Sequence, residues 1–247
     1  MAFKNVSGLV LREVRYKEAD RILTVLTAAE GKITVKARGA LRKSSRIAAA
    51  TQQLTYSDFT LFENKGKMTA NEAVIKESFS GLRMEIEKFA LGAYFAECLE
   101  MYAMEGEPAE ELLQLGLNSL YALSEGLGNR EKVKAAFEVR LTCLSGYRPQ
   151  LAACSACGEE NVSSPLLQLD SGTVVCRNCR KPDSGQTVPL SSAALQAMRY
   201  LTEAPAKKML SFQLDPVDLG ILSQAAERYF LRCSERSFRT LEYYKSL

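Results

Sequence analysis

The sequence predicts an α+β protein in which a small barrel of five strands precedes an α-helical domain with an inserted four-cysteine module. Three observations predict it. Apolar residues recur in short, strand-like runs up to about residue 78, they recur every three or four positions after residue 80, and two CxxC pairs lie between residues 154 and 179. We expect the barrel domain over residues 1–80, a helical domain over 81–148 and 183–247, and the cysteine module over 149–182.

Five segments before residue 80 have the composition and spacing of strands: residues 9–11, 22–26, 33–37, 54–62 and 68–75. The third alternates most cleanly, with Ile33 and Val35 on one face and Lys32 and Lys36 on the other. One face therefore enters a core and the other presents cations. Five short strands in about 75 residues are typical of an OB-fold, a barrel that binds single-stranded nucleic acid.

The predicted barrel is also basic. Residues 1–80 contain 14 Lys and Arg against 8 Asp and Glu, whereas the rest of the chain contains 18 against 21. Residues 31–50 hold no acid and six cations, which we expect to bind DNA phosphates: Lys32, Lys36, Arg38, Arg42, Lys43 and Arg46. The alternative is an ordinary solvated charged face. Tyr56, Phe59 and Phe62 are candidates for base stacking, although core positions are the commoner use of aromatic residues in a barrel.

After residue 80 the apolar spacing predicts helices over residues 86–102, 108–127, 131–144, 192–201 and 216–230, and a last helical turn at 237–241. Ser191 or Ser192 and the pair Asp215-Pro216 are suitable helix starts. Arg140 lies within the apolar face of the third helix. A snorkelling or glutamate-paired arginine is the favoured interpretation, and a cation at the floor of a groove that binds a partner peptide is the other.

The cysteines Cys154, Cys157, Cys176 and Cys179 form two CxxC pairs separated by eighteen residues, the spacing of a four-thiolate zinc site. Two disulfides or four unpaired thiols are the alternatives. Four thiolates leave no position for water on the metal, and the chain contains no histidine. The sequence therefore predicts one structural Zn²⁺ per chain. The other three cysteines fit reduced thiols in the cytoplasm.

Several function classes lack support in the sequence. No apolar run approaches the length of a membrane-spanning helix, and the N-terminus has no signal-peptide pattern. Gly66 and Lys67 are followed by Met68, which does not fit a phosphate-binding loop. Without a histidine or a recognisable carboxylate pair, we expect no enzyme.

Four features, taken in order, resemble the RecO family of bacterial DNA repair and recombination mediators. They are residues 20–26 (DRILTVL), Gly31-Lys32 with residues 37–40 (ARGA), residues 137–141 (FEVRL) with 146–151 (GYRPQL), and the cysteine quartet. The resemblance implies an N-terminal OB-fold, a helical domain and an inserted zinc module. It also implies cytoplasmic, nucleoid-associated binding of single- and double-stranded DNA, and annealing of complementary strands without nucleotide hydrolysis.

The implied partners are RecR and the acidic C-terminal tail of the single-strand binding protein, and the implied outcome is loading of RecA onto gapped DNA. Arg140, among apolar neighbours, suits an acidic peptide that ends in a hydrophobic residue. A different class remains open from the residues alone, namely a zinc-ribbon and OB-fold factor that binds RNA or assists transcription.

Overall fold

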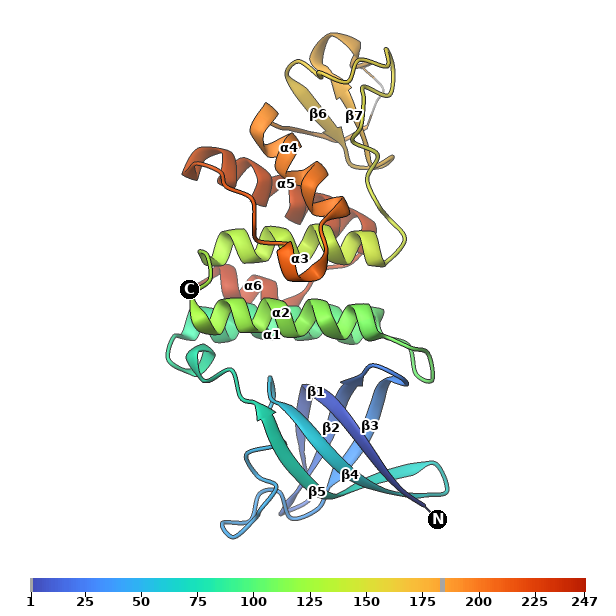
Figure 1. The fold of residues 1–247 in the computed structure, drawn as a ribbon, viewed down its shortest axis with the longest axis vertical. Coiled ribbons are helices and arrows are strands. Elements are labelled where there is room, and N and C mark those ends of the chain that lie inside the picture. The colour runs from blue at the N-terminus through green and yellow to red at the C-terminus, as the bar shows by residue number, and fades with distance from the viewer. Residues whose placement is uncertain (1, 183–184) are drawn as a thin grey trace. The chain divides into compact units, whose positions relative to one another are not determined.

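Residues 2–77 contain the five strands of a closed barrel in the computed structural model, which describes residues 2–182 and 185–247. They are β1 (Ala2–Tyr16), β2 (Asp20–Thr27), β3 (Gly31–Ala37), β4 (Tyr56–Asn64) and β5 (Lys67–Glu77). The hydrogen-bonded order is β1-β2-β3-β5-β4, and β1 also pairs with β4 (Figure 1). Only β3 and β5 run parallel. Strands first and helices afterwards confirm the predicted α+β class.

β1 is much longer than the three residues that its sequence indicated. Its 15 residues pair with β4 through the N-terminal half and with β2 from Gly8 onward, with an irregularity between Val10 and Arg12. Only residues 8–11 of the strand are buried. The prediction found this buried centre, and the exposed ends carry no hydrophobic alternation that would have extended it.

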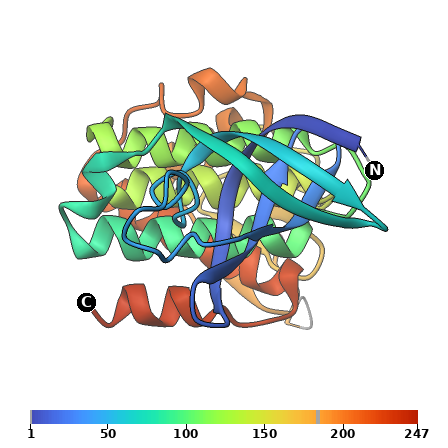
Figure 2. The ribbon, with the colours of Figure 1, turned by 90° about the horizontal axis from the view of Figure 1, so that it is seen from below.

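The barrel encloses its own hydrophobic core, formed by the inward side chains of the alternating strands. Its main members are Val10, Leu23, Val25, Ile33, Val35, Phe59, Leu61 and Ala70. The segment between β3 and β4 contributes Ala40, Ile47 and Ala50 to the same core. Figure 2 shows this segment as a coiled stretch of chain beside the strands. Residues 38–55 are therefore anchored from within, while their charged side chains stay outside.

The chain divides into two compact units. The first joins the barrel to η1 (Ser80–Arg83), α1 (Ile86–Tyr102), α2 (Glu110–Glu125) and the C-terminal α6 (Arg239–Lys245). α1 has the predicted bounds, whereas α2 ends before Leu127 because Gly126 and Gly128 adopt positive φ. α6 packs on α1, with Phe238 edge-on to Tyr94 at 5.7 Å.

The second unit, residues 126–237, contains α3 (Arg130–Leu144), α4 (Ser192–Glu203) and α5 (Pro216–Ser234), together with a small sheet. The sheet consists of β6 (Pro165–Gln168), β7 (Thr173–Cys176) and β8 (Thr187–Pro189), and the short helices η2 (Arg177–Cys179) and η3 (Ala206–Lys208) follow β7 and α4. The predicted β6–β7 hairpin is confirmed, and β8 was missed. Ser191 and Asp215 cap α4 and α5 as expected. The predicted domain boundaries at residues 80, 148 and 182 stay predictions.

A buried ionic cluster joins two helices of the second unit. The Lys134 ammonium lies 2.8 Å from Glu138 Oε1 on α3 and 2.8 Å from Glu227 Oε2 on α5. Burial opposes the charged lysine, but the two carboxylates outweigh this effect and raise its pKa.

Within the described residues, no helix is both long and apolar enough to cross a lipid bilayer.

Gly31 connects the barrel to the segment between α1 and α2 by backbone contact. It has φ of +63°, and a Cβ built on it would lie 1.9 Å from the Met104 carbonyl oxygen. Lys32 N donates to that same oxygen at 3.2 Å, and Gly106 N donates to Glu30 O at 2.9 Å. The close approach leaves no room for a side chain at position 31.

We predict that Gly31→Ala destabilises the protein by about 3 kcal/mol, because the new methyl group displaces the Met104 backbone and breaks these hydrogen bonds. Gly66→Ala is the matched control, since Gly66 has φ of +71° but open space around the Cβ position. It should cost about 1 kcal/mol from backbone strain alone. Urea unfolding of both variants measures the difference, and equal losses would contradict the steric explanation.

Candidate nucleic-acid interface and metal site

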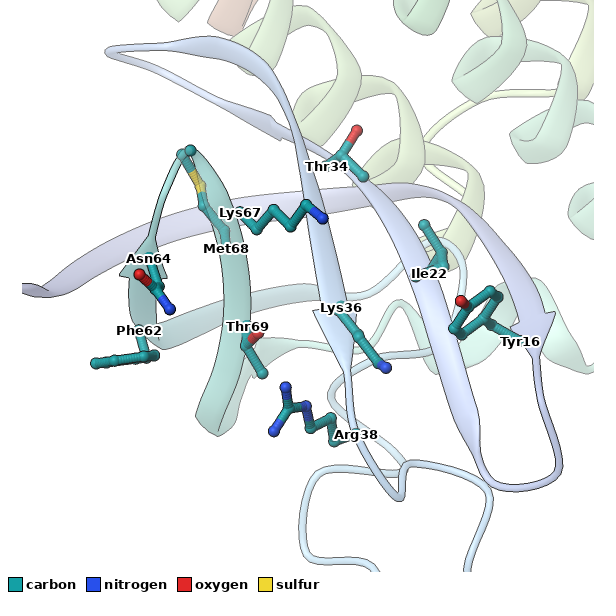
Figure 3. A pocket seen from close by; sticks show the side chains of 11 residues that line it. Tyr16, Ile22, Thr34, Lys36, Arg38, Phe62, Asn64, Lys67, Met68 and Thr69 are labelled. Atoms are coloured by element: carbon teal, nitrogen blue, oxygen red, sulfur yellow. The ribbon is translucent and has the colours of Figure 1, made fainter. Parts of the chain in front are cut away.

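A cavity of about 540 Å³ lies on the outer surface of the barrel, between the β1–β2 and β4–β5 turns. Its lining comes from every strand of the barrel: Tyr16, Ile22, Thr34, Lys36, Arg38, Phe62, Asn64, Gly66, Lys67, Met68 and Thr69 (Figure 3). Outward positions of β2 and β3, flanked by these two turns, are where OB-folds bind oligonucleotides. The cavity is therefore the first candidate for a nucleic-acid site.

Three cations surround this cavity. Lys36 and Arg38 were predicted, and Lys67 was not. In Figure 3, Lys36 and Lys67 extend from the neighbouring strands β3 and β5. Lys36 forms an ion pair with Asp20, with 3.0 Å between Nζ and Oδ2, and the same ammonium lies 5.0 Å from the centroid of the Tyr16 ring. Within residues 2–182 and 185–247, no carboxylate forms an ion pair with Arg38 or Lys67, so both present positive charge to solvent.

The three aromatic residues predicted as candidates for base stacking occupy different environments. Phe59 is buried in the barrel core, Tyr56 lies beneath the Lys76 ammonium, and only Phe62 lines the cavity. Tyr16, which sequence reasoning missed, lies on the opposite side with 42% of its surface exposed. Its outward position follows from the true extent of β1, which the sequence did not reveal. Two rings therefore flank the cations, as in surfaces that bind single strands by stacking.

The remaining cations predicted to bind DNA lie outside the lining of the cavity. Arg42, Lys43 and Arg46 are exposed on residues 38–55, beyond the end of β3. Lys32 instead donates through Nζ to the Glu100 carbonyl oxygen at 2.9 Å, near the C-terminal end of α1. A helix C-terminus attracts such a cation. The structure thus brings Lys36 and Arg38 together at the cavity and places Lys32 against a helix.

Asp20 fixes the start of the basic segment. It accepts a hydrogen bond from Gly39 N at 2.8 Å and pairs with Lys36 at 3.0 Å. The Gly39 N–H, followed by the Lys36 ammonium and the nearby Arg38, lowers the pKa of the Asp20 carboxyl. This carboxylate therefore holds the turn after β3 and neutralises part of the charge at the cavity.

The four predicted cysteines converge in the second unit. Their sulfurs all lie within 4.8 Å of one another, with Cys157 Sγ at 3.5 Å and Cys179 Sγ at 3.6 Å from Cys176 Sγ. A disulfide needs about 2.05 Å, whereas four sulfurs around a zinc ion lie about 3.8 Å apart for Zn–S bonds of about 2.3 Å. The arrangement fits a metal ion and not two disulfides.

The protonation of these sulfurs also suits a cation. Burial opposes ionisation of Cys154, but the backbone N–H groups of Cys176, Cys157 and Ala156 lower its pKa to about 6. Hydrogen bonds with the Cys154 and Cys157 sulfurs raise the pKa of Cys176 to about 12. Without a metal, neighbouring thiols retain protons in this way because adjacent thiolates repel each other. A divalent cation among them removes that repulsion.

Arg140 lies on α3 within the second unit, and it lines neither the barrel cavity nor the cysteine cluster. Its Nη1 donates to the carbonyl oxygens of Leu201 and Thr202, both at 3.2 Å. These carbonyls belong to the last turn of α4, where intrahelical donors are lacking. The arginine is half-buried and joins α3 to the end of α4.

Known proteins and family models match this chain along nearly its whole length. Family models described as "Recombination protein O N terminal" and "Recombination protein O C terminal" match residues 1–79 and 83–242. Proteins named "DNA repair protein RecO" are similar to nearly all of it. That of Acetivibrio thermocellus is 33% identical over 247 residues, covering 100% of this chain and 98% of the relative. That of Symbiobacterium thermophilum is 32% identical over 254 residues, with 100% and 98% covered. That of Desulforudis audaxviator is 32% identical over 240 residues, with 95% and 94% covered.

The lowered pKa of Asp20 predicts an acid-dependent contribution to stability. Such a contribution is complete above the pKa of the unfolded state, about 3.9, and is lost as pH falls through the lower folded-state value. Asp20→Asn should therefore be less stable than the wild type at neutral pH, and the gap should close below about pH 4. Urea midpoints across this range measure it, with Glu18→Gln as the control for one lost charge in the same turn. A gap that does not change with pH would contradict the assignment.

Proposed function

The chain belongs to the recombination protein O family, RecO, and from this membership we propose that it is a DNA-binding mediator of recombinational repair that acts without catalysing a reaction. The resemblance inferred from its sequence motifs is thereby confirmed, and a role in DNA repair and recombination follows from it. The finer proposal is that the protein binds single- and double-stranded DNA at the bacterial nucleoid and anneals complementary strands. With RecR, it would then help to load RecA onto DNA coated by the single-strand binding protein.

The observation that carries this proposal is the barrel cavity with Lys36, Arg38 and Lys67 between the rings of Tyr16 and Phe62. Cations attract phosphate whatever the base sequence, and exposed rings stack on any base. Arg42, Lys43 and Arg46 extend the same positive surface along residues 38–55. We leave Lys32 out of the interface because its ammonium is engaged with the Glu100 carbonyl oxygen.

The mechanism is electrostatic. Two complementary strands repel each other through their phosphates, and this repulsion opposes their first contact. Cations on the barrel would neutralise part of that charge, while stacking on Tyr16 and Phe62 would hold bases unpaired until a complementary strand arrives. Base pairing between the strands then supplies the free energy for annealing, so no nucleotide hydrolysis is required.

The acidic tail of the single-strand binding protein remains a proposed ligand of Arg140. Among the described residues, the hydrogen bonds of this guanidinium use only Nη1, so its other N–H groups are available to a carboxylate. Its position at the end of α4 would place such a carboxylate beside the helix. RecR remains a proposed partner without an assigned surface.

Strand annealing separates this function from that of an RNA-binding or transcription factor with a similar barrel. The assay mixes complementary DNA strands coated with single-strand binding protein and follows duplex formation by fluorescence transfer. The proposed function requires faster duplex formation in the presence of the protein and without a nucleotide cofactor. An unchanged rate would exclude it.

Charge reversal at the barrel should weaken DNA binding. We predict that Arg38→Glu with Arg42→Glu lowers the affinity for single-stranded DNA at least tenfold and reduces the salt slope of log K by about 1.4, since each phosphate contact contributes about 0.7. Fluorescence anisotropy over a salt titration measures both quantities. Lys207→Glu with Lys208→Glu is the matched control, because these two lysines are exposed on η3 and lie outside the lining of the cavity. Equal effects of the two pairs would mean that net charge alone governs binding.

For the metal, we propose that Cys154, Cys157, Cys176 and Cys179 hold one structural Zn²⁺ per chain. Metal analysis of freshly purified, reduced protein should give about one zinc per chain. Because a structural zinc site contributes on the order of 10 kcal/mol to the folding of its module, chelation should unfold the region around β6 and β7 while the barrel stays folded. Hydrogen exchange resolves the two regions, and protein without zinc or with unchanged exchange after chelation would overturn the assignment.

A further inference from the structure

A second cavity, of about 960 Å³, lies in the second unit beside the cysteine cluster. Its lining is drawn from β6, η2, β8, α5 and the residues next to them: Ser164, Pro165, Leu166, Arg177, Arg180, Gly185, Gln186, Thr187, Pro189, Leu190 and Arg228. Three of these are arginines, and all three are exposed. A cavity with three arginine side chains has the composition of a site for a polyanion.

The metal-binding loop itself positions two of the arginines. Arg177 and Arg180 lie three residues apart, at the start and at the C-cap of η2. Side chains at this spacing eclipse each other in a 3₁₀ turn, so both fall on one side of it. Cys176 and Cys179 have the same spacing one residue earlier and hence face a direction about 120° away. One turn of chain therefore directs two thiols to the metal cluster and two guanidinium groups to the cavity.

Among the described residues, no carboxylate neutralises this cavity. The third arginine, Arg228, comes from α5, and no acidic side chain is among the described residues that line the cavity. Two described acids of the same unit are engaged elsewhere, since Asp170 Oδ1 lies 2.6 Å from Arg232 Nε and Glu227 Oε2 lies 2.8 Å from Lys134 Nζ. In the described part of the chain, Arg177, Arg180 and Arg228 have no ion-pair partner. Their charge is available to a ligand.

The lining favours phosphate over an acidic peptide with apolar anchors. Of the four apolar side chains in the lining, Pro165 and Leu190 are buried, Leu166 is half-buried and Pro189 is exposed. The rest of the exposed lining consists mainly of guanidinium groups, the Ser164 hydroxyl and the Gln186 amide. Such a surface supplies forked donors for phosphate oxygens but little area on which a hydrophobic residue could be buried.

We propose that this cavity is a second DNA-binding site, in which Arg177, Arg180 and Arg228 bind the phosphates of a strand segment other than the one held by the barrel. The proposal rests on the proposed function, because a protein that anneals two strands needs to hold both. It also gives the metal a role beyond stability. The zinc loop would keep Arg177 and Arg180 on one side of η2, where they meet Arg228.

The test compares two double variants with the same charge change in the same unit. Arg177→Gln with Arg180→Gln removes two cavity cations, and Lys207→Gln with Lys208→Gln removes two exposed cations on η3, outside the cavity lining. Binding of oligothymidylate is measured by anisotropy over a salt titration, and zinc content verifies that the cysteine loop is intact. We expect the salt slope to fall by about 1.4 for the arginine pair only. Between about 50 and about 200 mM salt, this variant would lose about sevenfold less affinity than the wild type.

Arg228→Gln provides a second variant outside the zinc loop, and its expected reduction in slope is about 0.7. Equal slopes for the arginine and lysine pairs would overturn the proposal. A polyglutamate peptide serves as the competing probe, and loss of its binding in the arginine pair with an unchanged DNA slope would reassign the cavity to a protein partner. If Arg38→Glu with Arg42→Glu weakens DNA binding while the arginine pair matches the lysine pair, the second site fails and the proposed function stands.

Discussion

Closure of the barrel is the constraint on which the candidate interface depends. Because β1 pairs with both β2 and β4, every strand has one face toward a sealed core. The alternation of β3 then has a single outcome, in which Val35 and Ala37 fill the core and Lys36 lies outside. The same closure brings the β1–β2 and β4–β5 turns to opposite sides of the outward face of β2 and β3. Cations and aromatic rings from distant parts of the sequence therefore meet there, among them Lys36 and Tyr16.

The sequence predicted what depends on local spacing. The barrel strands, the bounds of α1, the caps at Ser191 and Asp215 and the four converging cysteines all follow from period, capping chemistry or ligand spacing. The sequence could not predict the contacts between side chains from segments that are far apart in the chain. Lys32 and Lys36 share one face of β3 and look equivalent in the sequence, yet one meets a carbonyl of α1 and the other meets Asp20 and Tyr16. Tyr16 and Lys67 reach the cavity only through the register of strands that pair across it, and no local pattern encodes that register.

The small sheet of the second unit shows why a metal suits this part of the chain. Its strands have three or four residues each, and the buried side chains Leu167, Val174 and Val188 form only a narrow apolar layer. Burial of about 2 kcal/mol for each of a few such residues does not outweigh the entropy of ordering a loop of this length. A divalent ion held by the four thiolates would supply the missing free energy. It would also fix η2, which is too short to hold its own geometry.

Ion pairing inside the protein decides which cations remain available to a polyanion. Lys36 is partly neutralised by Asp20, Lys4 is paired with Glu30, and Lys134 is enclosed by two carboxylates. Arg38 and the cations of residues 38–55 lack such partners in the described chain, as do the three arginines of the second cavity. Net charge is therefore a poor guide to where a polyanion binds, since the whole chain carries only +3. The proposed annealing function requires that the strands be released afterwards, and this arrangement suits it. A few unpaired cations on two surfaces would give salt-sensitive, reversible attachment, whereas a continuous basic surface would hold the duplex product as firmly as the single strands.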